Sequence, residues 1–402
     1  MALNNAYKQT EVGLIPEDWD VKLLPQVTRF RGGKAHEQFI TDTGKYVCVN
    51  SKFISTDGEV RKLCSHNFSC ARQHDVLMVM SDLPNGKALA KAYLADADDR
   101  YAVNQRVCSL TAYRDSPRYL FYVLNRNPYF LKFDDGVNQT HLLNRVFQKC
   151  PIPLPPTLAE QEAIAGALSD ADAWIESLEQ LIAKKRQIKQ GAMQELLTGQ
   201  TRLPGFSGEW EAKRLGEVAD IDPENLGSET KPDYAFNYIS LEDVDCGTLR
   251  SHTEQVFHSA PSRARRKLRK NDVLISTVRP NLLSHLLFTL NGERWVCSTG
   301  FCVVRCRSGV TEPHFVFSHL FAESVNRQIE TLLTGSNYPA INSGDVKALQ
   351  LAFPEYAEQS AIADILSDMD KEIAALESKL AKARQIKQGM MQELLTGRIR
   401  LV

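Results

Sequence analysis

The sequence lacks any run of 18 consecutive apolar residues, and a membrane-spanning helix needs about 20. We therefore expect no membrane association. The opening residues, MALNNAYKQTEVG, also lack the basic and then apolar pattern of a secretion signal, which predicts a cytoplasmic protein. The nine cysteines are scattered and odd in number, which favours reduced thiols over a disulfide framework.

Motifs for binding a nucleotide or a methyl-donor cofactor are also missing. No G-x-x-x-x-G-K-[ST] phosphate loop occurs, so ATP binding is not indicated. The glycine pair Gly32-Gly33 lacks the G-x-G spacing that brings backbone close to a cofactor. Asn127-Pro128-Tyr129-Phe130 approaches the N-P-P-[YF] loop of adenine methyltransferases but lacks the second proline. Because it follows the apolar run YLFYVLNR, we interpret it as a helix stop.

A metal site has little support. Cys64, His66, Cys70 and His74 give the pattern C-x-H-x3-C-x3-H, which differs from the C-x2-4-C spacing of persuasive zinc sites. We therefore expect buried thiols and solvated histidines, and no bound metal.

An excess of positive charge is absent as well, because the net charge is −1. Residues 1–157 carry 20 basic and 16 acidic side chains (+4), and residues 201–355 carry 17 and 19 (−2). Such a balance argues against a free-standing nucleic-acid binder. One basic cluster stands out, and it could contact phosphates or form a solvated strand or turn. Its members are Arg263, Arg265, Arg266, Lys267, Arg269 and Lys270.

The strongest positive signal is a long internal repeat. Glu160–Leu203 and Glu358–Leu401 agree at 29 of 44 aligned positions, offset by 198 residues. Both copies contain RQIKQG and MQELLTG. The period is too long for a solenoid repeat, so the chain is a tandem duplication in which one globular domain precedes each copy.

Each copy predicts a long amphipathic helix. Apolar or small residues recur with the alternating spacing of four and three that is typical of a coiled-coil seam. The predicted seam residues are Ile164, Leu168, Ile175, Leu178, Ile182, Ile362, Leu366, Met369, Ile373, Leu376 and Leu380, with Ala171 completing the first series. The alternative is two separate core helices.

Glycines mark two points of each repeat. Gly199 and Gly397 stand where a helix-ending glycine is expected. Gly191 and Gly389 lie inside the predicted helices, where each costs about 1 kcal/mol relative to alanine. Because they recur at the same point of both copies, we expect close backbone packing or a local break there.

The globular halves match at scattered anchors. Trp19 aligns with Trp210, and the strand-like run from Asp75 aligns with that from Asp272. Ala102–Leu110 and Val296–Val304 predict a second matching strand. Helical patterns follow at Tyr119–Asn127 and His314–Ile329, and the polar segments Gly136–Asn144 and Gly335–Asn342 precede the long helices.

This layout resembles the specificity subunit of type I restriction–modification enzymes. The resemblance rests on PLPPTLAEQEAIA (Pro153–Ala165), TRLPGFSGEW (Thr201–Trp210) and the repeated QELLTG endings, and it covers the whole chain in its order of elements. It implies two target recognition domains, each reading one half of a split DNA sequence, and two antiparallel helices that space them. It also implies two modification (methyltransferase) partner subunits and, in the full complex, restriction subunits. S-adenosylmethionine and ATP are then expected on the partner subunits only, with no cofactor and no catalytic residue on this chain.

Candidate DNA-binding residues are those with paired donors or acceptors on predicted loops. A capped turn or solvated loop is the alternative for each. They are Arg29, Arg31, Lys34, His36, Asn85, Lys87, Gln139, His141 and Asn144 in the first half, and Arg279, Asn281, His285, Ser336, Asn337, Tyr338 and Asn342 in the second, besides Arg263, Arg265, Arg266, Lys267 and Arg269 of the basic cluster.

Candidate partner-binding residues are polar side chains that both repeats share and the seam does not need. They are Arg186, Gln187, Gln190, Gln194 and Glu195, with their counterparts Arg384, Gln385, Gln388, Gln392 and Glu393. Recent duplication alone would also preserve them.

The sequence therefore predicts a mixed α/β (α+β) protein. We expect recognition domains at residues 1–156 and 201–354 and spacer helices at residues 157–200 and 355–402, the helices forming an antiparallel coiled coil. The predicted function is to bind double-stranded DNA and give a restriction–modification complex its bipartite target. Two alternatives are a self-contained DNA adenine methyltransferase and a coiled-coil scaffold that binds only protein.

Overall fold

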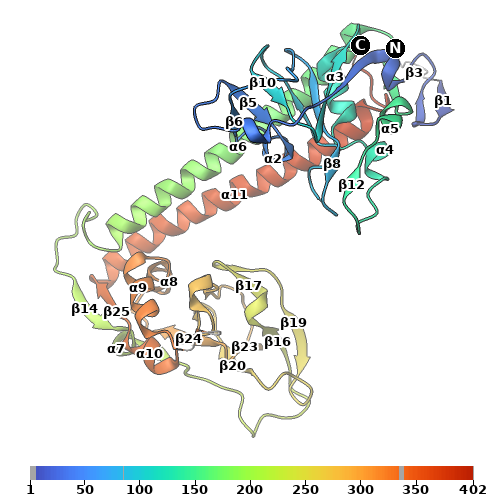
Figure 1. Ribbon diagram of the computed structural model, residues 1–402. Coiled ribbons are helices and arrows are strands. Elements are labelled where there is room, and N and C mark those ends of the chain that lie inside the picture. Colours follow the sequence, from blue (N-terminus) through green and yellow to red (C-terminus); the bar gives the residue numbers. More distant parts are fainter. Residues whose placement is uncertain (1–5, 85, 335–338, 402) are drawn as a thin grey trace. The chain divides into compact units, whose positions relative to one another are not determined.

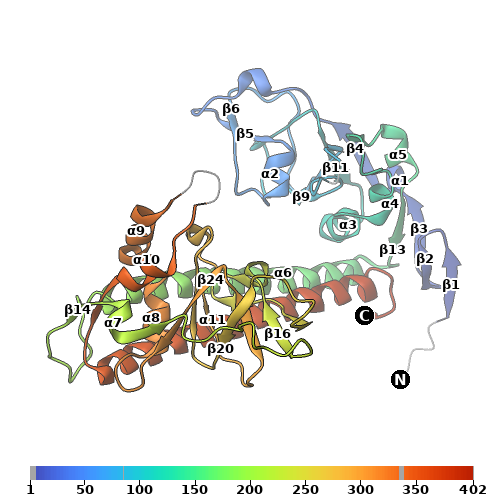
Figure 2. The same ribbon diagram turned by 90° about the horizontal axis from the view of Figure 1, so that it is seen from below.

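The computed structural model describes residues 6–84, 86–334 and 339–401. It divides into two compact units, Met1–Glu179 with Lys379–Val402, and Gln180–Ser378. Each unit contains one globular domain and about half of each long helix, α6 (Leu158–Leu196) and α11 (Tyr356–Leu394). Within each unit the two helix portions lie side by side, as Figure 1 and Figure 2 show.

Cross-helix ion pairs show that α6 and α11 are antiparallel. In the first unit Asp172 pairs with Lys387, and Glu179 pairs with Arg384 at 2.6 Å. In the second unit Arg186 pairs with Glu377 at 2.5 Å and Lys189 with Asp370 at 2.5 Å. Partner numbers fall along α11 as they rise along α6, and every predicted seam residue is buried or half-buried. The predicted antiparallel coiled coil is confirmed.

The expectation for the internal glycines is wrong. Helices α6 and α11 continue through Gly191 and Gly389, and a Cβ atom built at either position meets nothing within 4 Å. Neither glycine is therefore required by packing within the chain. By contrast, Gly199 and Gly397 each follow a long helix with φ of +69°, a left-handed conformation that favours glycine.

The first domain combines short helices with two main sheets. One is antiparallel, in the order β4-β11-β7-β9, and the other has the order β10-β5-β6 with β10 and β5 parallel. Its strands are β1 (Tyr7–Thr10), β2 (Gly13–Pro16), β3 (Asp20–Leu23), β4 (Thr28–Gly32), β5 (Tyr46–Val49), β6 (Leu63–Cys64), β7 (Val76–Val79), β8 (Ser81–Asp82), β9 (Ala92–Leu94), β10 (Tyr101–Val103), β11 (Val107–Ala112), β12 (Thr140–His141) and β13 (Pro151–Leu154). Its helices are α1 (Leu24–Val27), η1 (Glu37–Phe39), α2 (Ser51–Ser55), α3 (Pro117–Leu124), α4 (Pro128–Leu131) and α5 (Asn144–Gln148).

The second domain repeats this plan. Its antiparallel sheet has the order β15-β24-β21-β22, and its other sheet, β19-β16-β23-β20, contains the parallel pair β16 and β23. Its strands are β14 (Glu211–Arg214), β15 (Ala219–Ile221), β16 (Ala235–Ile239), β17 (Val244–Asp245), β18 (Thr248–Leu249), β19 (Thr253–Val256), β20 (Ala264–Leu268), β21 (Val273–Ser276), β22 (Leu286–Leu287), β23 (Trp295–Ser298), β24 (Phe301–Cys306) and β25 (Gln350–Phe353). Its helices are α7 (Leu215–Val218), η2 (Leu241–Asp243), η3 (Pro280–Leu282), α8 (Pro313–His319), α9 (Glu323–Leu332) and α10 (Ser343–Ala348).

The two domains are therefore related, as the sequence anchors predict. The runs from Asp75 and Asp272 form the buried strands β7 and β21. The expected single strand at Ala102–Leu110 is instead two strands, β10 and β11, because the polar residues Asn104–Arg106 form a turn. Val296–Val304 likewise splits into β23 and β24, and the pattern at His314–Ile329 splits into α8 and α9.

Hydrophobic packing joins each domain to its helix portions. The largest core of the first unit combines Trp19 and Tyr119 of the domain with Ile164 and Leu168 of α6. Buried Glu160 adds an ion pair with Arg400, whose Nη2 lies 2.8 Å from the carboxylate. In the second unit, buried Glu358 pairs with Arg202 in the same way, at 2.7 Å. A buried carboxylate needs such a partner, so each pair ties the first turn of one long helix to the segment that follows the other long helix.

Among the described residues, no helix is both long and apolar enough to cross a membrane.

Candidate nucleic-acid interface

A two-stranded ribbon in the first domain carries Gln139 and His141. Strands β8 and β12 pair antiparallel, with Thr140 opposite Asp82 and His141 opposite Ser81. Both Gln139 and His141 are exposed, and the Gln139 side-chain amide donates to the Ser81 hydroxyl at 3.1 Å. The ribbon thus presents two side chains that can bond to base edges from a defined backbone.

Other predicted residues of the first domain have mixed surroundings. Arg29 and Lys34 are exposed on and after β4. Arg31 is half-buried and pairs at 2.6 Å with fully buried Asp75. Because removing a partner would leave a buried charge, we interpret Arg31 as a structural residue.

His36 lies on a loop, just before η1, as predicted, but the fold buries its side chain. Its side chain is fully buried, and Nε2 accepts from the backbone N–H of Phe68 at 3.0 Å. Nδ1 lies 2.6 Å from the carbonyl oxygen of Lys34, which makes Nδ1 the protonated nitrogen. With both nitrogens engaged, His36 has no free group for a base contact.

The remaining residues of the first half lie near the ribbon or outside the described range. Lys87 is exposed on the loop after β8, and Asn144 is exposed as the first residue of α5. Asn85 lies outside the described residues.

In the second domain, two predicted loops come together. An antiparallel bridge joins Val278 to Ala340, and the backbone N–H of Arg279 donates to the Pro339 carbonyl at 2.8 Å. Arg279 and Asn281 are exposed. The amide oxygen of exposed Asn342 accepts from the backbone of Gly344 and Asp345 and caps α10, so this oxygen is occupied. Ser336, Asn337 and Tyr338 lie outside the described residues.

His285 is another predicted residue that the fold buries. Its side chain is fully buried, and Nδ1 accepts from the backbone N–H of Ser276 at 3.1 Å. Burial lowers the pKa of His285 to about 4. The neutral, enclosed imidazole is not available to DNA.

The basic cluster lies on edge strand β20 and directly before and after it, and acidic neighbours neutralise part of it. Arg266 pairs with Asp222 at 2.9 Å, and Arg269 pairs with Glu224. Arg265 lies over the ring of Phe257, 4.9 Å from its centroid. Lys267 is half-buried, whereas Arg263, Arg269 and Lys270 are exposed. Fewer of these cations are therefore available for phosphate contact than the sequence suggests.

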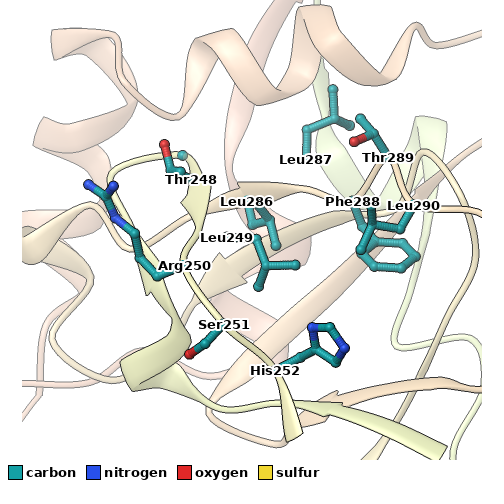
Figure 3. Close-up of a pocket in the computed structure, with 11 residues that line it drawn as sticks. Thr248, Leu249, Arg250, Ser251, His252, Leu286, Leu287, Phe288, Thr289 and Leu290 are labelled. Atoms are coloured by element: carbon teal, nitrogen blue, oxygen red, sulfur yellow. The ribbon is translucent and has the colours of Figure 1, made fainter. Parts of the chain in front are cut away.

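The second domain also has a recess of about 430 Å³ beside the β17–β18 hairpin and β22. Leu249, Leu286 and Phe288 give it an apolar floor, while Thr248, Arg250 and Ser251 lie on the hairpin side (Figure 3). Its lining offers apolar contact and hydroxyl hydrogen bonds rather than a paired acid and base.

The shared polar residues of the repeat lie on the surface of the helices. Gln187, Gln190 and Gln194 are exposed, as are their counterparts Gln385, Gln388 and Gln392. Arg186 and Arg384 are also exposed, but each forms a cross-helix ion pair. Glu195 accepts from the Thr201 hydroxyl at 3.1 Å, and Glu393 pairs with Arg398 at 3.4 Å. The glutamines are thus the part of this surface that the helix pairing does not use.

Two residues that the sequence analysis did not identify, Gln105 and Arg106, line a recess together with residues of the ribbon. Exposed Gln105 and Arg106 lie with Ser81, Gln139 and His141 around a shallow recess of about 400 Å³. The stretch Asn104-Gln105-Arg106 interrupts an apolar run with three polar residues, a signal that would have indicated a turn but that the strand prediction for Ala102–Leu110 passed over.

Two related domains with exposed, polar loops, each joined to a repeated antiparallel helix pair, define a two-domain recognition subunit. The family described as "Type I restriction modification DNA specificity domain" matches the chain twice, at residues 16–190 and 207–385. These matches span most of the sequence, so the chain belongs to this family.

Individual relatives agree with this assignment. The chain is 22% identical to the type I restriction enzyme MjaVIII specificity subunit of Methanocaldococcus jannaschii over 96% of this chain and 94% of that protein. It is 23% identical to a putative MjaX specificity subunit of the same organism, covering 98% and 97%.

Among solved structures, the fold is similar to the S subunit of a type I restriction–modification system from M. genitalium. The TM-score is 0.62, with 16% identity and 98% of both chains covered. A second similar structure, described as showing complex assembly and conformational transition of the type I R-M system, has a TM-score of 0.56 and 20% identity over 96% of this chain and 99% of that one.

Proposed function

We propose that this chain gives a type I restriction–modification complex its DNA target, with each domain reading one half of a bipartite sequence. The supporting observation is the repetition of one plan in both units: a recognition domain, its helix portions and a buried Arg–Glu pair. Two domains of like fold but different loops suit two different half-sites.

We further propose that the shared glutamine surface docks two identical methyltransferase subunits, one on each repeat. The three glutamines on each repeat are exposed, and none pairs the two helices, so pairing does not account for their identity. The same surface in each unit would present the same chemistry to each partner.

Co-expression with the methyltransferase subunit tests this proposal. Native mass spectrometry should find two partner copies per chain. Alanine at Gln187, Gln190 and Gln194 should release one copy, and alanine at the three counterparts as well should release both. Lys379→Ala is the matched control, because Lys379 is exposed and its counterpart in the first repeat is Leu181. If the variant with alanine at all six glutamines still bound two partner copies, the glutamines would not be part of the interface.

We place no cofactor and no catalysis on this chain, because its sequence lacks the motifs for S-adenosylmethionine and ATP. The purified chain alone should neither bind S-adenosylmethionine nor methylate DNA. Stoichiometric binding of S-adenosylmethionine in a calorimetric titration would contradict this and support the self-contained methyltransferase.

A further inference from the structure

The β8–β12 ribbon ends in two apolar side chains. Strand β8 runs from Ser81 to Asp82 and β12 runs antiparallel to it, so Leu83, just after β8, and Val137, three residues before β12, lie on the two chain segments that leave the same end of the ribbon. The strand pair β8–β12 projects from the body of the first domain (Figure 1). We call Leu83 and Val137 the ribbon tip.

The exposure of the ribbon tip is unusual. Leu83 is 66% exposed and Val137 is 76% exposed, the two highest values among large hydrophobic side chains of the described residues. Two strongly exposed apolar side chains on the segments at one end of a ribbon are candidates for a binding surface. The ribbon tip therefore points to a partner with an apolar feature.

Hydrogen bonds hold the backbone at Leu83 and at Val137 in place. The Asp82 carboxylate accepts from the backbone N–H groups of Leu83 at 2.9 Å and Ala88 at 2.7 Å. The Asp135 carboxylate accepts from Val137 at 2.9 Å and Asn138 at 2.8 Å, and these bonds lower the pKa of Asp135 to about 2. A residue whose backbone is already held in place loses less entropy on binding.

The neighbours of the ribbon tip identify the partner's chemistry. Gln139 and His141 follow Val137 on the same ribbon, and Gln105 and Arg106 line the adjoining recess. The DNA major groove presents hydrogen-bond donors and acceptors beside one apolar group, the C5-methyl of thymine, whereas the minor groove has no methyl group. The major groove, about 12 Å wide, also admits a two-stranded ribbon.

Charge at the ribbon tip favours the base edges over the phosphates. Asp134 and Asp135 lie just before Val137, and both are acceptors for backbone N–H groups. Carboxylates repel phosphate oxygens but can accept from the amino group of cytosine. The ribbon tip thus suits the floor of the groove.

We propose that Leu83 and Val137 read thymine through its C5-methyl group, in the half-site that the first domain recognises. This inference rests on the proposed function and specifies part of its DNA recognition. It requires at least one thymine in that half-site.

Replacement of thymine by uracil, which removes only the C5-methyl, tests the proposal. The complex assembled with its partner subunits is titrated with duplexes in which each thymine of the half-site is replaced in turn. For the unaltered chain, we expect one replacement to weaken binding about three- to tenfold. The Leu83→Ala/Val137→Ala variant should bind thymine DNA about as weakly as the unaltered chain binds the uracil duplex. It should no longer distinguish thymine from uracil.

Leu14→Ala and Val60→Ala are matched controls, because both side chains are exposed in the same unit and neither belongs to the ribbon: Leu14 is in β2 and Val60 follows α2. Both controls should keep the full preference for thymine. Equal binding of thymine and uracil DNA by the unaltered chain would overturn the thymine proposal but not the proposed function. A tip variant with the same preference for thymine as the unaltered chain would have the same consequence. Absence of any sequence preference in the assembled complex would instead overturn the proposed function.

Discussion

At the scale of single residues, burial separates structural from functional side chains that look alike in sequence. His36 and His285 are candidate readers by residue type, yet both are enclosed and bonded to backbone N–H groups. Arg31 and Arg305 are held by the buried carboxylates of Asp75 and Asp272. Each of these arginines pairs with an aspartate 33 or more positions away in the sequence, so the local sequence does not reveal the pairing.

Two buried histidines predict that the second unit loses stability in acid. Neither ring nitrogen of His319 has a hydrogen-bond partner among the described residues, and burial lowers its pKa from 6.5 to about 3. His285 is shifted in the same direction. Because the unfolded chain binds these protons more readily, stability is complete above about pH 6.5 and falls as the pH drops.

The variant His319→Leu separates this effect from general acid denaturation. We expect it to be at least as stable as the parent at pH 7, since it removes unpartnered buried nitrogens. Between pH 6.5 and 4 it should lose roughly 3 kcal/mol less than the parent. Denaturant melts at several pH values measure this, and parallel curves for parent and variant would refute it.

At the scale of elements, periodic patterns were predictable and pairings were not. The seam spacing identified both long helices, because their burial depends on a pattern within one segment. The β8–β12 ribbon joins Ser81 to His141, so no local pattern indicates it. Gln105 and Arg106 were missed because the apolar residues on either side of the turn read as one continuous strand.

The internal glycines of the helices carry a stability prediction. Gly191 and Gly389 have open space where a Cβ would lie. Alanine at either position should therefore raise the free energy of unfolding by roughly 1 kcal/mol, the difference in helix propensity. Gly397→Ala is the contrasting variant, because its Cβ would lie 2.6 Å from Pro16 and its φ is +69°. In denaturant unfolding, the free energy of unfolding should be higher than the parent's for Gly191→Ala and Gly389→Ala and lower for Gly397→Ala. A lower value for Gly191→Ala would contradict the prediction and indicate that packing requires glycine there.

If the long helices act as a spacer, their length sets the gap between half-sites. One inserted heptad keeps the seam in phase and adds about 10.5 Å, close to three base pairs at about 3.4 Å each. Insertion after Glu179 and Ser378 preserves both the Glu179–Arg384 and the Arg186–Glu377 pairs. Insertion after Leu178 and Leu376, the sites suggested by seam spacing alone, would separate both pairs.

We expect the heptad variant to methylate the same half-sites with a longer gap. Its control carries heptads of the same composition in which the seam residues are polar, and this control should fail to assemble. An unchanged gap with full activity would mean that the helices do not measure the DNA.

At the scale of the whole molecule, duplication accounts for the organisation of function. Each unit repeats the same attachment of domain to helix, while the loops that carry Gln139 and Asn281 differ between the halves. Under the proposed function, a common scaffold with different loops would let the two half-sites change independently. The family assignment and the repeated helix surface agree with this division.

The central claim is that this chain determines a bipartite DNA target, and mapping methylated adenines tests it most directly. Single-molecule sequencing would compare cells that contain the partner subunits with and without this chain. The account predicts methylation only with the chain, at a two-part motif with a fixed gap, and an altered first half-site when Gln139 and His141 are replaced. The same methylated sites without the chain, or one continuous motif that these replacements leave unchanged, would contradict it.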